Sequence, residues 1–177
     1  MNIILAAGGT GGHMIPAHAL AAELTARKIG VALITDERGT KIPGCPDKIA
    51  AHVLPAGRLT GNPRSWLSGV RAIWRGRAMA KQLYASFNPS VVVGFGGYPA
   101  FPSLLGAFSF GIPTIIHEQN AVLGRVNRLT ARKVNAIATS YPDILRLAER
   151  NRHKVHLVGN PVREEVMLLR DQSYPPL

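Results

Sequence analysis

Residues 2–13 read NIILAAGGTGGH, and this stretch decides the fold class. The apolar run at residues 2–6 has the length of a buried strand, and the glycines after it indicate a loop. Residues 17–27 favour a helix, and Pro16 suits its first turn, where a helix tolerates proline. A strand, a glycine-rich loop and a helix in this order form a unit that binds phosphate through backbone N–H groups.

The rest of the chain repeats this alternation of strand and helix. Apolar runs predict strands at residues 31–35, 49–54, 91–93, 114–117, 134–138 and 155–158. Helices are predicted at residues 65–87, 103–110, 123–131 and 142–150. Short connections between strands rich in Val, Ile and Leu indicate an α/β fold, a Rossmann-like doubly wound parallel sheet with helices on both faces. Such sheets bind ligands beyond the carboxyl ends of their strands, so function is expected in the loops there.

Composition excludes several classes of protein. The chain has 177 residues, and no apolar run approaches the roughly 20 residues that span a bilayer. Residues 1–5 lack the positive charge of a secretory signal. The single Cys45 excludes an internal disulfide and a Cys-rich zinc site, and the six histidines lack zinc-ligand spacing. We therefore expect a protein of a reducing compartment without a metal site.

The positive charge is concentrated in the middle of the chain. The net charge is +11, and no carboxylate occurs between Asp47 and Glu118, where lysine and arginine are frequent. Such a field attracts nucleic acid, anionic lipid or a phosphorylated substrate. Nucleic acid is not an expected partner, because no strand presents aromatic side chains for base stacking.

The predicted helix at residues 65–87 begins with an apolar face bordered by arginines. The apolar residues are Trp66, Leu67, Val70, Ile73 and Trp74, and the arginines are Arg64, Arg71 and Arg75. An apolar face with a basic border is typical of a helix that lies at a membrane interface. The same periodicity also fits a helix that packs on the core of the domain, so both interpretations stand.

Two glycine-rich loops follow predicted strands. In residues 8–13 the third glycine of the dinucleotide-binding motif is replaced by Met14, and no Gly-Lys-Ser/Thr follows as in a P-loop. Residues 94–99, GFGGYP, repeat the design after a second strand, and Tyr98 adds a hydroxyl. Two such loops predict a shared cradle for a diphosphate or sugar phosphate.

Two further motifs also end predicted strands. Residues 117–120, HEQN, place four hydrogen-bonding side chains in a row, which favours a binding site over simple packing. Residues 159–163, GNPVR, place Arg163 in the first turn of the next element. This arginine is a candidate partner for a phosphate or for the neighbouring glutamates.

These four motifs, in this order and spacing, closely resemble the N-terminal half of the MurG family of bacterial peptidoglycan glycosyltransferases. The resemblance covers essentially the whole chain, and it implies a GT-B fold, in which two Rossmann-like domains face each other across a cleft. Residues 1–165 are then expected to form the acceptor- and membrane-binding domain, and residues 166–177 the interdomain linker. The donor-binding domain is expected to lie outside the chain, so the isolated chain is expected to be inactive.

The resemblance implies an inverting transfer of N-acetylglucosamine from UDP-GlcNAc to lipid I, the undecaprenyl-diphosphate-linked N-acetylmuramoyl-pentapeptide, to give lipid II. It implies no metal or cofactor, and a peripheral protein that contacts the anionic cytoplasmic leaflet of the bacterial inner membrane. One alternative is a non-catalytic domain that binds a lipid diphosphate and the membrane. Another is a nicotinamide-dependent oxidoreductase domain, which rests on Asp36 after the second strand.

The resemblance also assigns roles to individual residues. His13 is the candidate base that accepts the proton of the acceptor C4 hydroxyl, and Glu118 is the alternative base or orients the acceptor. The residues expected to contact UDP-GlcNAc are Thr10, Gly11, Gly12, Asn120 and Arg163. The residues expected at the acceptor diphosphate are Gly11, Gly12, Gly96, Gly97 and Tyr98. The apolar face of the helix at residues 65–87, together with Phe108, is expected to dock on the membrane.

Overall fold

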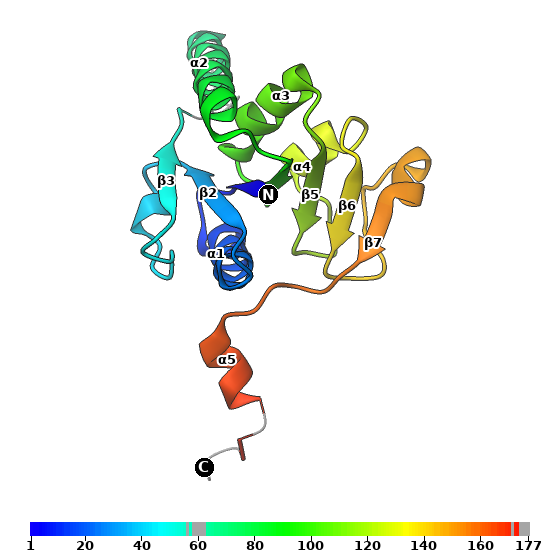
Figure 1. The fold of residues 1–177 in the computed structure, drawn as a ribbon. Helices are drawn as coiled ribbons and strands as arrows, with labels where there is room; N and C mark the ends of the chain where they lie inside the picture. The colour runs from blue at the N-terminus through cyan, green and yellow to red at the C-terminus, as the bar shows by residue number, and fades with distance from the viewer. Residues whose placement is uncertain (56, 58–62, 171, 174–177) are drawn as a thin grey trace.

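A computed structural model of the chain describes residues 1–55, 57, 63–170 and 172–173, apart from the side chains of residues 63–65 (Figure 1). Within these residues one sheet of seven strands has the order β3-β2-β1-β4-β5-β6-β7, and every neighbouring pair is parallel. The strands are β1 (Asn2–Ala6), β2 (Gly30–Thr35), β3 (Ala50–Val53), β4 (Val91–Gly94), β5 (Thr114–Glu118), β6 (Ala136–Thr139) and β7 (Val155–Leu157).

Helices cover both faces of the sheet (Figure 1). The α-helices are α1 (Gly11–Ala26), α2 (Pro63–Phe87), α3 (Ala100–Phe110), α4 (Arg125–Thr130) and α5 (Glu164–Leu169), and the 3₁₀ helices are η1 (Gly39–Lys41) and η2 (Glu149–Lys154). Helix α1 packs on one face, and α2, α3 and α4 pack on the other. Helix α5 stands apart from the sheet at the C-terminal end of the described chain (Figure 1). This arrangement confirms the predicted α/β fold with a parallel sheet.

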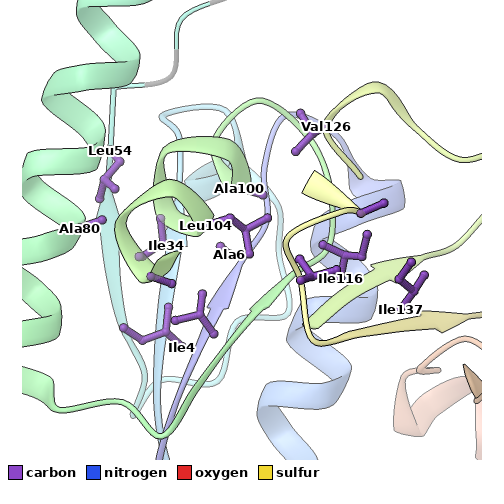
Figure 2. Close-up of a cluster of buried hydrophobic side chains, with 14 of the residues drawn as sticks. Ile4, Ala6, Ile34, Leu54, Ala80, Ala100, Leu104, Ile116, Val126 and Ile137 are labelled. Atoms are coloured by element: carbon purple, nitrogen blue, oxygen red, sulfur yellow. The ribbon is translucent and has the colours of Figure 1, made fainter. Parts of the chain in front are cut away.

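Alternate residues of the central strand β1 enter two separate hydrophobic cores. Ile4 packs with Leu104 of α3 and Ala80 of α2 in the core shown in Figure 2. Ile3 and Leu5 point to the opposite face and pack against α1. Because strand side chains alternate between the two faces, a strand segment buried on both sides must be apolar throughout, as residues 3–6 of β1 are.

One predicted helix is absent. Residues 142–150 form no α-helix, because Leu145 pairs instead with the loop that follows β5. The Leu145 N–H donates to the Ala121 carbonyl at 2.8 Å, and the Leu145 carbonyl accepts from the Leu123 N–H at 3.0 Å. Backbone groups used in this way are not available for a helical ladder, so this prediction was wrong.

Helix α1 begins earlier than predicted. It starts at Gly11, so Pro16 lies inside the helix rather than in its first turn. Pro16 is buried, and it has no N–H to donate to the carbonyl of Gly12. Because α1 starts at Gly11, the last two glycines of the glycine-rich loop, Gly11 and Gly12, belong to the first turn of the helix.

The strand order reverses direction between β1 and β4. From β1 the chain passes outward to β2 and β3, whereas from β4 it passes the other way to β5, β6 and β7. The loops after β1 and β4 therefore part at this point and leave a crevice, which is where parallel sheets of this type bind ligands. None of the described helices has the length and apolar character needed to cross a membrane.

Candidate active site

A cavity of about 190 Å³ opens at the reversal of strand order, beyond the carboxyl ends of β4 and β5. Its lining includes His13 of α1, three residues after β4, the end of β5 and the start of α4. The residues are His13, Gly96, Gly97, Tyr98, Glu118, Asn120, Gly124, Arg125, Val126 and Asn127. The cavity thus brings together the two candidate bases, His13 and Glu118, with Asn120 and the second glycine-rich loop.

The two glycine-rich loops lie directly against each other. Gly97 has a φ of +76°, and a Cβ there would collide with the carbonyl oxygen of Gly8. Gly96 has a φ of +93°, and a Cβ there would lie 3.0 Å from the imidazole ring of His13. Glycine is therefore required at both positions for backbone conformation and for close approach, independently of any ligand.

His13 is held at the start of α1. Its Nδ1 lies 3.2 Å from the hydroxyl oxygen of Thr10. Burial lowers the pKa of His13, and this outweighs the opposing influence of the Glu118 charge and of a backbone hydrogen bond to Gly8. The imidazole is therefore neutral at neutral pH, which is the form that accepts a proton.

Glu118 is 2% exposed, and four N–H groups surround its carboxylate. One oxygen accepts from the backbone N–H and the side-chain amide of Asn120, at 3.2 and 3.1 Å. The other accepts from the Gly124 N–H at 2.8 Å and from the Asn127 amide at 3.0 Å. A carboxylate that accepts this many hydrogen bonds holds the loop after β5 and the start of α4 in place.

The His117 side chain connects β5 to the loop after β7 through a hydrogen bond. Its Nε2 lies 3.0 Å from the carbonyl oxygen of Gly159, and its Nδ1 lies 3.0 Å from the amide nitrogen of Gln119. Burial lowers its pKa, and this outweighs the opposing influences of the Gly159 bond and the Glu118 charge. All four polar side chains of the HEQN motif are thus bonded to one another or to the backbone, and two of them, Glu118 and Asn120, line the cavity.

Residues 3–139 match the glycosyltransferase family 28 N-terminal domain. The chain belongs to glycosyltransferase family 28. It is 65% identical over 175 residues, 99% of its length, to a protein of Erythrobacter litoralis (strain HTCC2594) named UDP-N-acetylglucosamine--N-acetylmuramyl-(pentapeptide) pyrophosphoryl-undecaprenol N-acetylglucosamine transferase. A protein of the same name from Novosphingobium aromaticivorans is 63% identical over 174 residues, 98% of this chain.

The structure of Acinetobacter baumannii MurG superposes on this family 28 chain with a TM-score of 0.75 at 28% identity. The superposition covers 99% of this chain and 50% of that one. The family 28 chain spans 44% of the length of the Erythrobacter relative and 45% of the Novosphingobium one. These similarities confirm the predicted membership and the Rossmann-like domain of a GT-B glycosyltransferase.

Two polar residues that line the cavity, Asn127 and Arg125, were not predicted from the sequence. Asn127 is 2% exposed and donates to the His117 carbonyl and to Glu118, and its Oδ1 has no hydrogen-bond partner among the described residues. The available signal was a polar residue beside Val126 on the buried side of a predicted helix. Arg125, at the first position of α4, also lines the cavity.

Other predicted site residues lie outside this cavity. Thr10, Gly11 and Gly12 do not line it but form the turn from which α1 and His13 begin. Arg163 immediately precedes α5 and lines a separate cavity of about 700 Å³, between α1 and residues 160–167. Arg163 is therefore not brought together with the catalytic candidates in the structure.

The predicted apolar face of α2 is partly exposed and partly buried. Trp66, Leu67 and Trp74 are 54–61% exposed, whereas Ile73 is 8% exposed and faces the protein interior. Ile73 thus does not belong to the exposed surface. The predicted apolar face covers enough of the helix circumference that one edge lies in solvent and the other packs on the core. Val70 is half-buried.

Cations lie over several of the aromatic rings nearby. The Arg77 guanidinium lies 5.0 Å from the ring centroid of Trp74, and the Lys133 ammonium lies 5.8 Å from that of Phe108. Phe108 is half-buried and packs against the core, while Phe110 on α3 is 46% exposed. Arg71 and Arg75 are exposed, and the side chain of Arg64 lies outside the described residues. We call Trp66, Leu67, Trp74, Arg71, Arg75 and Arg77 the α2 surface.

Proposed function

We propose that the chain is the acceptor-binding part of an enzyme that transfers N-acetylglucosamine from UDP-GlcNAc to lipid I. The observation that carries this proposal is the cavity at the reversal of strand order, where a neutral, accessible His13 faces a fully bonded Glu118. The relatives named for this activity are 63–65% identical over nearly the whole chain. Since the chain spans less than half of their length, turnover is proposed for the larger protein.

In the proposed reaction the C4 hydroxyl of the N-acetylmuramoyl sugar attacks C1 of N-acetylglucosamine. The C4–O–C1 bond forms as the bond from C1 to the UDP oxygen breaks, and UDP leaves with the electron pair. His13 accepts the hydroxyl proton on the unprotonated nitrogen of its ring, and the Thr10 hydroxyl lies 3.2 Å from its Nδ1. A lowered pKa keeps this imidazole unprotonated at neutral pH, as a general base requires.

Glu118 is proposed as the residue that shapes the site rather than as the base. Its oxygens accept four hydrogen bonds from Asn120, Gly124 and Asn127, so it fixes the two elements that flank the acceptor. Its negative charge also favours the protonated form of His13, which stabilises the imidazolium that forms during attack. Asn120, exposed at the rim, is proposed to contact the hydroxyls of the transferred sugar.

The two packed glycine loops are proposed to bind the diphosphates. Gly11 and Gly12 form the first turn of α1, whose N–H groups have no partner within the helix. Gly96, Gly97 and Tyr98 line the cavity on the other side of His13. Arg163 is proposed to contact UDP-GlcNAc from a different side, because it lines a separate cavity.

The α2 surface is proposed to dock on the anionic cytoplasmic leaflet of the bacterial inner membrane. Two exposed tryptophans within a set of arginines match the composition of an interfacial helix. Each basic residue near an anionic surface contributes about 1 kcal/mol of binding free energy. This surface brings the protein to a leaflet in which a lipid-linked acceptor resides.

A nicotinamide-dependent activity has less support. A dinucleotide-binding domain uses the acid after its second strand to bind the ribose hydroxyls. In this chain Asp36 already accepts hydrogen bonds from Gly9, Arg38 and Gly39. A non-catalytic domain that binds the lipid diphosphate remains the alternative for the isolated chain.

The proposal is tested by NMR titration of the chain with a soluble short-prenyl lipid I analogue, with UDP-GlcNAc and NADH in parallel. Shifts of the Gly11, Gly12, Gly96 and Gly97 amides with the analogue are the expected result. A His13→Ala variant of the larger protein is expected to retain binding of the analogue and to lose turnover by about 100-fold or more. A response to NADH, or no response to the analogue by the folded chain, would contradict the proposal.

A further inference from the structure

Asp36 follows β2 directly, and its two carboxylate oxygens have different partners. Oδ1 accepts from the Gly9 N–H at 3.2 Å and from the Gly39 N–H at 2.9 Å. Oδ2 accepts from Nε and Nη2 of Arg38, at 3.1 and 2.8 Å. The carboxylate thus joins the first glycine-rich loop to the turn after β2 through Oδ1, and it is bonded to Arg38 through Oδ2.

The turn that carries these groups is itself fixed. Gly39 is buried, and a Cβ at this position would collide with the hydroxyl oxygen of Thr35 and lie 3.0 Å from the sulfur of Met14. Thr35 donates a hydrogen bond to that sulfur at 3.3 Å. Asp36 is therefore attached to a tightly packed turn. We infer that its hydrogen bond restricts the position of Gly9, and that Asp36 does not simply adapt to the glycine-rich loop.

Gly9 is the point at which the glycine-rich loop is held. Its φ is +85°, and a Cβ there would lie 2.9 Å from Nη2 of Arg38. Its N–H is directed to Asp36, and the loop then turns through Thr10 into the first turn of α1. The conformation at Gly9 thus sets the direction in which the N–H groups of Gly11 and Gly12 point.

We propose that Asp36 is a positioning residue for diphosphate binding: its Oδ1 fixes Gly9 and so orients the amides of Gly11 and Gly12, while Arg38 keeps the carboxylate in place through Oδ2. This inference rests on the proposed function, because it assumes that a diphosphate binds at this loop. It gives the acid after β2 a role in loop geometry, in place of the ribose contact that a dinucleotide-binding domain would give it.

The separate partners of the two oxygens allow the idea to be tested with four variants. Asp36→Ala removes both sets of bonds. Asp36→Asn keeps Oδ1 for the two backbone N–H groups and loses the ion pair, and Arg38→Ala removes the ion pair alone. Glu149→Ala is the control, because Glu149 forms an ion pair of 2.6 Å with Arg152 that is likewise exposed.

The dissociation constant of a soluble short-prenyl lipid I analogue is measured for each variant by calorimetry. We expect an increase of about tenfold for Asp36→Ala, about threefold or less for Asp36→Asn and Arg38→Ala, and no change for Glu149→Ala. The Gly11 and Gly12 amide resonances, which are not in contact with Asp36, are expected to move in Asp36→Ala and to stay nearly in place in Asp36→Asn. Thermal unfolding of each variant is recorded alongside.

Asp36→Glu serves where Asp36→Ala does not fold, because it keeps the charge and displaces the oxygens by one methylene. It is expected to weaken binding by about as much as Asp36→Ala. Equal binding by wild type, Asp36→Ala and Asp36→Glu would overturn the inference, as would a loss in Asp36→Asn as large as that in Asp36→Ala. Failure of the wild-type chain to bind the analogue would instead refute the proposed function.

Discussion

The cavity beyond β5 and the α2 surface are built in opposite ways. At the cavity, the buried Glu118 and its neighbour His117 are bonded to other side chains and to the backbone. On the α2 surface, Trp66 and Trp74 are more than half exposed, and an arginine lies over the ring of Trp74. A network of shared hydrogen bonds responds to substitution as a unit, whereas exposed side chains contribute nearly independently.

The largest expected effect is in the cavity network. Glu118→Ala leaves N–H groups of Asn120, Gly124 and Asn127 without their acceptor, so we expect the free energy of unfolding to fall by about 2–3 kcal/mol. Urea denaturation measures it. Glu149→Ala is the control, because this glutamate is 85% exposed in its ion pair with Arg152 and is expected to contribute about 0.5 kcal/mol or less. Equal effects of the two variants would mean that these N–H groups do not depend on Glu118 as their acceptor.

A second test separates the two sides of α2. Trp66→Ser combined with Trp74→Ser is expected to weaken binding to anionic vesicles by about tenfold or more and to leave the unfolding free energy nearly unchanged. Ile73→Ser is the matched variant on the buried side of the same helix, and it is expected to lower that free energy by about 2–3 kcal/mol. Vesicle sedimentation and urea denaturation give the two quantities. Unfolding of the double tryptophan variant would show that this face packs on the protein.

A third test uses pH. Burial lowers the pKa of His13, His18 and His117 below the value of 6.5 expected in the unfolded chain. The unfolded state therefore binds protons more readily below pH 6.5, so stability is complete above that pH and is lost as the pH falls. Each histidine contributes at most about 1.4 kcal/mol per pH unit in this range. Unfolding free energies measured between pH 5 and 7.5 are expected to depend less on pH in His117→Gln, and an unchanged dependence would contradict this.

The smallest expected effect concerns the rim of the cavity. Arg125 lines the cavity, and Arg128 lies one turn further along α4, outside it. Arg125→Ala is expected to raise the dissociation constant of the lipid I analogue by about threefold to tenfold, as the loss of one exposed cationic contact to an anion implies. Arg128→Ala is expected to change it by less than about twofold, and calorimetry at low salt distinguishes the two. Equal effects would indicate a general field of charge around α4.

The sequence was sufficient to predict the sheet and the position of the glycine-rich loops at the ends of strands, because buried parallel strands are continuous apolar runs and glycine clusters mark their ends. It was not sufficient for residues 142–150, where the pairing of Leu145 with a distant loop overrides local helical preference. The sequence also did not distinguish Ile73, which is buried, from Trp74, which is exposed. The two are adjacent in sequence and on one predicted face, and their burial depends on how α2 packs on the rest of the protein. Asn127 and Asp36 act through hydrogen bonds to distant backbone groups, which no local pattern encodes.

The placement of the tryptophans has a spectroscopic consequence. The chain contains two, Trp66 and Trp74, and both lie exposed on one helix away from the cavity. The tryptophan fluorescence of the chain, excited selectively over that of tyrosine, thus originates in the α2 surface alone, and its emission reports the polarity around that helix. Insertion into a lipid interface will shift the emission to the blue, whereas occupation of the cavity will leave it unchanged. The natural sequence thus carries its own optical label for membrane contact.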